Sequence, residues 1–95
     1  MMLKYTRTTM EKLIDIFEDL EYVVRFEKGH FQSGYAVVHD KKIVIINKFF
    51  DLEARINALM EILDKIVVEE VLLDQKSRVF YHFLLKESLI KPAEQ

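Results

Sequence analysis

The sequence predicts an α+β domain with the element order α-β-β-β-α-α, in which helices pack on a three-stranded antiparallel meander. Three observations support this prediction. An amphipathic helical pattern lies near the N-terminus, three short segments rich in β-branched and aromatic residues follow between Tyr22 and Asn47, and a second amphipathic pattern begins at Leu52. Short connections between successive strands favour antiparallel neighbours.

The composition describes one compact domain of 95 residues, 51% of them hydrophobic and 32% charged, with two glycines and one proline. Cysteine is absent, which excludes disulfides and thiolate metal sites. A formal charge of −2 without a basic run argues against nucleic acid as a partner. Because neither a signal peptide nor a membrane-spanning run is evident, we expect a cytoplasmic protein without a membrane partner. The domain is expected to cover residues 1–95, with frayed ends at 1–7 and 91–95.

The first elements follow from a cap and two periodicities. Thr8 and Glu11 fit a capping box, which predicts a helix over residues 8–20. Its apolar stripe has helical spacing and comprises Met10, Leu13, Ile14, Phe17 and Leu20. The segment after it predicts a strand over residues 22–27.

Two further strands are predicted over residues 35–39 and 42–47, joined by a turn at Asp40-Lys41 whose type is uncertain without a glycine. The loop before them is bracketed by Gly29 and Gly34, either of which is a candidate for a turn position with positive φ.

The predicted strands carry apolar side chains on both faces, at Val37-Val38 and from Ile43 to Ile46. Strands of this kind are covered on two sides. We therefore expect either helices on both faces of the sheet or one face buried against a second copy of the protein.

The C-terminal half predicts two helices. Asp51 is a suitable N-cap for a helix over 52–66, whose buried stripe is expected to comprise Leu52, Ile56, Leu59, Met60, Leu63, Ile66 and Val67. Residues 67–73 are expected to form an irregular connector or a short helical turn. Asp74 or Ser77 caps a last helix that Pro92 ends, with an inward face of Val79, Phe80, Phe83, Leu84 and Leu89.

Residues with catalytic or metal-binding chemistry are sparse. His30, His39 and His82 are not spaced as paired ligands, and His82 is expected to be partly buried. Ser33 follows His30 closely, but no nucleophile motif surrounds it and serine is common in turns. Phosphate-binding loops are also absent. These residues indicate ordinary structural roles, and the sequence predicts no metal, no cofactor and no catalytic residue.

Two cations, Lys48 and Arg55, flank the predicted start of the second helix, where exposed N–H groups and the helix dipole favour an anion. They are candidate residues for binding a small anionic ligand. A local ion pair between Asp51 and Arg55 is the alternative explanation.

The consecutive aromatics Phe49 and Phe50 cannot both point easily into one core. One interpretation is a hydrophobic staple for the following helix, with one ring half exposed. The alternative is an aromatic anchor in a protein interface.

The segment Ile45-Ile46-Asn47, Arg55 and the run from Met60 to Asp64 resemble the core of minimal zincin domains of the ImmA/IrrE type. In that family the helix carries H-E-x-x-H, whereas here Met60 and Asp64 replace both histidines and Glu61 alone remains. The resemblance therefore implies a degenerate, inactive hydrolase-like domain without zinc. The whole chain, with its segments GHFQSGY and INKFFD, is more similar to small bacterial α+β proteins to which no activity is assigned.

Together these observations point away from an enzyme. The leading hypothesis is a small protein-interaction module that forms a homodimer and buries one sheet face, or that binds another protein. The alternatives are a binder of small anionic ligands at Lys48 and Arg55, and the degenerate hydrolase-like domain.

Overall fold

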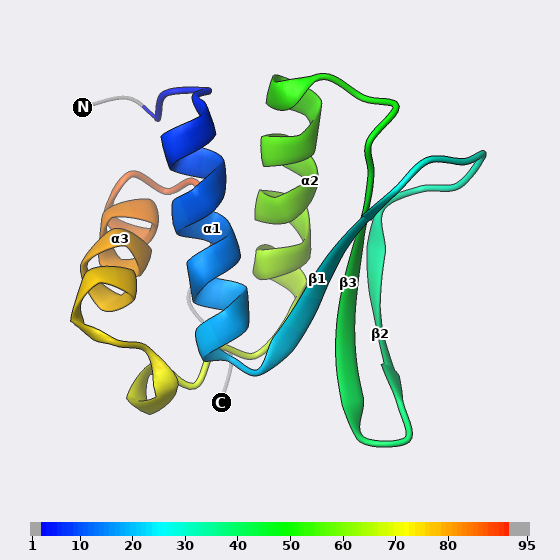
Figure 1. Cartoon of the computed structure of the whole chain (residues 1–95). Coiled ribbons are helices and arrows are strands. Elements are labelled where there is room, and N and C mark those ends of the chain that lie inside the picture. Colours follow the sequence, from blue (N-terminus) through cyan, green and yellow to red (C-terminus); the bar gives the residue numbers. More distant parts are fainter. Residues whose placement is uncertain (1–2, 92–95) are drawn as a thin grey trace.

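The computed structural model describes residues 3–91 and confirms an α+β architecture (Figure 1). The elements are α1 (Arg7–Asp19), β1 (Tyr22–Glu27), β2 (Gly34–Val38), β3 (Lys41–Asn47), α2 (Leu52–Lys65), a short 3₁₀ helix η1 (Glu70–Leu72) and α3 (Gln75–Lys86). The ends expected to fray lie partly outside the described residues, at 1–2 and 92–95.

The sheet is mixed, so the prediction of an antiparallel meander was wrong. Its strand order is β1-β3-β2, with β1 parallel to β3 and β2 antiparallel to β3. The central position belongs to β3, which carries the apolar run from Ile43 to Ile46, and both of its edges are hydrogen-bonded. Residues 28–33 cross two strand spacings, about 10 Å, to place β2 at the far edge. The connection of residues 28–33 is long enough for this crossing, and the burial that β3 gains at the centre of the sheet favours it.

The hairpin between β2 and β3 turns at His39-Asp40, one residue earlier than predicted. Their φ values of 51° and 67° give a type I′ turn, whose left-handed conformation His and Asp adopt more readily than most residues. Neither Gly29 nor Gly34 has a positive φ, so the expectation for the glycines was also wrong.

The start of α1 differs from the predicted capping box. Thr6 is the N-cap, and its hydroxyl oxygen accepts a hydrogen bond from the backbone N–H of Thr9 at 3.2 Å. A threonine two residues upstream of Thr8 thus accepts one of the free N–H groups of the first turn. At the other end, Glu21 turns the chain into β1 with a left-handed φ of 72°.

Helices cover one face of the sheet in two layers. Figure 1 shows α1 and α2 side by side against the sheet, with α3 on the outer side of α1. The core between these layers is continuous, and its largest fully buried side chains are Leu13, Ile16, Phe17, Leu20, Val44, Ile46, Ile56, Leu59, Leu63, Tyr81 and Leu84. The periodicities of α1 and α2 predicted most of this core but missed Ile16 and Ile62, and Val67 is exposed instead.

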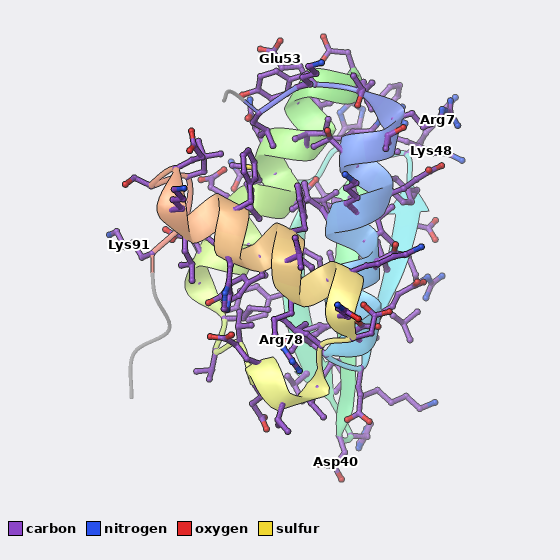
Figure 2. All side chains as sticks on the ribbon, turned by 90° about the vertical axis from the view of Figure 1, so that its left-hand side faces the viewer. Arg7, Asp40, Lys48, Glu53, Arg78 and Lys91 are labelled. Atoms are coloured by element: carbon purple, nitrogen blue, oxygen red, sulfur yellow. The ribbon has the colours of Figure 1, made fainter. Side chains whose placement is uncertain are left out.

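Side-chain caps begin both C-terminal helices where the sequence places them. Asp51 accepts the N–H of Ala54 at 2.9 Å, and Asp74 accepts the N–H of Ser77 at 2.8 Å. The connector between the helices is irregular apart from η1, as expected. Figure 2 shows Arg78 beside this connector, and its guanidinium donates to the carbonyls of Glu70 and Leu73.

The last helix departs from prediction in its end and its orientation. It ends at Lys86, before Pro92, because Ser88 adopts a left-handed φ of 57° and Leu89 N–H bonds to Leu84 O at 3.0 Å. Its buried residues are Ser77, Tyr81 and Leu84. Val79 is 65% exposed, so the helix is rotated relative to the predicted inward face.

Candidate interaction surface

Among residues 3–91, no helix lies against one face of the sheet. The register places Val23, Ile43 and Ala36 in one row across the strands, and Arg25, Ile45 and Gly34 in the next. Val44 and Ile46, on the opposite face, are fully buried beneath the helices. We call the uncovered surface the open face and define it by Val23, Arg25, Ala36, Val38, Ile43 and Ile45.

The open face is largely apolar. Val23 is 58% exposed and Val38 is 49% exposed, while Ile43 and Ile45 between them are half-buried. At one margin Arg25 and Glu27 form an exposed ion pair of 3.1 Å. The sequence pointed to apolar side chains on both strand faces, and within residues 3–91 the helices cover one of those faces.

The edge strand β2 is exposed on its other face as well. Tyr35 and Val37 point to the helix side, yet they are 43% and 60% exposed. Figure 1 shows why: β2 lies at the outer margin of the sheet and its hairpin extends beyond the helices. The strand is therefore apolar and accessible from both faces.

Asn47, at the end of β3, fixes the loop that leads into β2. Its side-chain amide donates to the carbonyls of Gly29 and Phe31 at 2.8 and 2.7 Å, and its side-chain oxygen accepts the N–H of Phe49 at 3.0 Å. The residue is 2% exposed. Sequence reasoning missed this role. The available signal was an amide that directly ends an apolar strand beside a loop with two glycines.

The residues considered for catalysis have structural surroundings. The hydroxyl oxygen of Ser33 accepts the backbone N–H of Asn47 at 2.8 Å, and the ring of His30 lies 6.4 Å from that of Phe49, measured between centroids. Among the residues that the structure describes, no group of three His, Asp or Glu side chains is placed to hold a metal ion.

His82 is exposed, which corrects the expectation of partial burial, and its Nε2 lies 2.5 Å from a carboxylate oxygen of Glu70. It lies one position beyond the buried Tyr81 and so turns outwards from α3. This contact ties the connector between α2 and α3 to the last helix.

The two candidate anion ligands are not equivalent. Arg55 donates through Nε to Phe50 O at 2.7 Å and through Nη2 to Lys48 O at 2.9 Å. The carboxylate of Asp51 accepts a backbone N–H as helix cap, in place of the ion pair with Arg55. Figure 2 shows the Lys48 side chain extending outwards. The guanidinium thus clamps the connector between β3 and α2, and two of its nitrogen atoms are already bonded to backbone carbonyls.

The candidate interface aromatics are both accessible. Phe49 is 64% exposed and Phe50 is 51% exposed. The backbone beneath them is held at one end by Asn47 and at the other by Arg55. Their rings therefore stand on a fixed turn next to the end of β3.

The positions that resemble the zincin motif have other surroundings in this chain. Glu61 is exposed on α2, and the carboxylate of Asp64 accepts the backbone N–H of Lys91 at 2.6 Å. On the sheet, burial and the nearby Tyr35 phenol raise the pKa of Tyr22. The Tyr22 phenol therefore stays protonated at neutral pH, which does not suit a general base.

A groove of about 1080 Å³ lies between α3 and the start of α1. Its apolar part includes Val79, Phe80 and Phe83, and the ammonium of Lys12 lies 5.5 Å from the centre of the Phe80 ring. Its charged lining mixes lysines with Asp15 and Asp74. The groove accounts for the exposure of Val79, but its mixed charge selects no class of ligand.

Within residues 3–91, no helix combines the length and the apolar character needed to cross a bilayer. Comparison of the chain with protein-family models, curated proteins and solved structures found no match.

Proposed function

We propose that the protein acts by association, as a non-enzymatic interaction module that forms a homodimer through its sheet. The observation that supports this proposal most strongly is the half-covered sheet. A central strand buried on one face presents Ile43 and Ile45 on the other, and the edge strand β2 is exposed on both.

Apolar burial is the main source of affinity in stable homodimers, whose interfaces resemble a domain core divided in two. Contiguous apolar surface on a small protein marks such a contact. The exposed side chains Val23, Val37 and Val38 lie on the same sheet, and Phe49 stands at the end of its central strand. A dimer through the sheet would remove part of this surface from water.

A small anionic ligand at the start of α2 has less support. Two of the donor atoms of Arg55 already bond to backbone carbonyls, and their loss would destabilise the connector. A ligand there would have to be held by the remaining guanidinium atoms and by Lys48, which extends away.

Sedimentation equilibrium of the full chain tests the proposal. We expect a dimer at tens of micromolar that dissociates on dilution. Because the dimer binds only folded chains, the melting temperature should also rise with protein concentration. A monomer at tens of micromolar, with a melting temperature that does not depend on concentration, would contradict the proposed homodimer.

A further inference from the structure

We infer that two copies join edge to edge through β2, as a symmetric antiparallel strand pair centred on Ala36. The result would be a continuous sheet in which each copy contributes its strands in the order β1-β3-β2, with β2 at the centre of the dimer. This inference rests on the proposed homodimer and specifies which surface forms it.

The hairpin determines which backbone groups of β2 point outwards. Val38 and Lys41 flank the two-residue turn, so the carbonyl of Val38 faces the N–H of Lys41 and points towards β3. Backbone groups alternate in direction along a strand. Those of Ala36 therefore also point towards β3, and the N–H and C=O groups of Tyr35 and Val37 point to the free edge.

Exposed sheet edges usually carry a feature that prevents pairing with another chain, such as a charged side chain, a proline or a bulge. The sequence of β2, Gly34–Val38, has no charged residue and no proline, and its register against β3 is continuous. The opposite edge, β1, carries Arg25 and Glu27. The two edges of one sheet thus differ, and β2 alone lacks protection.

A two-fold axis at Ala36 pairs all of β2 with its copy. Tyr35 then lies opposite Val37 of the second copy, and each exchanges its outward N–H and C=O groups with the other. Gly34 lies opposite Val38 and Ala36 opposite Ala36, so no like charges meet. The Tyr35–Val37 pair is an aromatic and β-branched contact of the kind that stabilises neighbouring strands. It would cover the two side chains that β2 exposes on the helix side.

This arrangement keeps the charged residues of β1, at the opposite edge, away from the contact between the copies. An axis perpendicular to the sheet keeps the helices of both copies on one side, and among the described residues Figure 1 shows no helix or strand beyond the free edge of β2. Stacking two open faces would instead desolvate Arg25 and Glu27, at a cost that edge pairing does not incur. The open faces of the two copies would then form one wider surface.

The variant Val37→Pro distinguishes edge pairing through β2 from stacking of two open faces. Val37 directs its N–H to the free edge, so Val37→Pro removes two hydrogen bonds between the copies, one from each Val37 N–H, and none within the chain. Edge strands tolerate such a proline. We expect a folded monomer by circular dichroism and sedimentation. The control, Val23→Lys, places a charge on the open face away from β2 and should remain dimeric. A dimeric Val37→Pro variant would overturn edge pairing but leave the homodimer intact, whereas monomeric wild type would overturn both.

A cysteine at position 36 tests the register without relying on proline. The chain contains no cysteine, so each introduced thiol is unique. At the axis, the two Cα atoms of a non-hydrogen-bonded pair lie about 4.5 Å apart, which is within disulfide range. Ala36→Cys should form a cross-linked dimer under mild oxidation, and Val23→Cys should not. Stacked sheets lie about 10 Å apart, so a dimeric Ala36→Cys variant that fails to cross-link would overturn the inference.

Discussion

Asn47 carries a buried amide at the point where β3 ends, and its side chain makes three hydrogen bonds to the backbone. Replacing it with alanine leaves the carbonyls of Gly29 and Phe31 without these donors. We expect Asn47→Ala to lower the free energy of unfolding by about 2–4 kcal/mol, since each lost bond contributes about 0.5–1.5 kcal/mol. Urea denaturation followed by circular dichroism measures this change.

The matched control is Asn57→Ala on the exposed side of α2, where the side chain accepts one hydrogen bond from Tyr5. That variant should lose no more than about 1 kcal/mol. Equal losses in the two variants would show that Asn47 does not hold the loop.

Glu21 takes a left-handed φ of 72° after α1, a conformation in which its Cβ crowds the backbone. Glycine relieves that strain, although it gains more entropy in the unfolded chain. We expect Glu21→Gly to raise the free energy of unfolding by about 0.5–1 kcal/mol. Glu18→Gly, inside the same helix, should lower it by about 1 kcal/mol. Loss of stability in both variants would contradict the strain at Glu21.

Individual residues were predictable where the physical rule is local. Asp51 and Asp74 were recognised as caps because a short acidic side chain before an amphipathic run satisfies free N–H groups. Thr6 was missed because three threonines lie close together and a neighbouring one completed a capping box. Asn47 was missed because its partners lie 16 and 18 residues away in sequence.

At the scale of elements, Arg55 joins β3 to α2 by holding the connector between them. Arg55→Ala should lower the free energy of unfolding by about 1–2 kcal/mol through loss of two hydrogen bonds. Arg55→Lys should recover little of this, because an ammonium cannot reproduce the planar fork of donors. Lys48→Ala serves as the surface control, with a change within about 0.5 kcal/mol.

Phosphate distinguishes this clamp from an anion site. If Arg55 clamps the connector, added phosphate should leave the melting temperature of the wild type unchanged, and that of Arg55→Ala as well. A phosphate-dependent rise in the wild type that disappears in Arg55→Ala would contradict the structural role and favour a ligand.

Element types and most boundaries followed from periodicity and caps, but the arrangement of the elements did not. Proximity in sequence suggested that β1 pairs with β2, whereas β3 separates them because its apolar side chains gain most from the centre. The orientation of α3 was also missed. Val79 and Tyr81 are both compatible with a helical pattern, and the packing of α3 against α1 decides which one is buried.

For the molecule as a whole, the sequence predicted a sheet with apolar residues on both faces. It left two alternatives, namely helices on both faces or one face buried against a second copy. The described helices lie on one side, which leaves the open face and β2 available for association. The sequence singled out Phe49 and Phe50, which are both exposed, but it did not single out the edge strand, because strand order decides which strand lies at an edge.

We propose that the protein works as a homodimer, and native mass spectrometry of the full chain is the first test of this claim. We predict a species of twice the 11.4 kDa chain mass, without an additional small molecule. A monomer that retains a small anionic adduct would contradict the claim and direct attention back to Lys48 and Arg55.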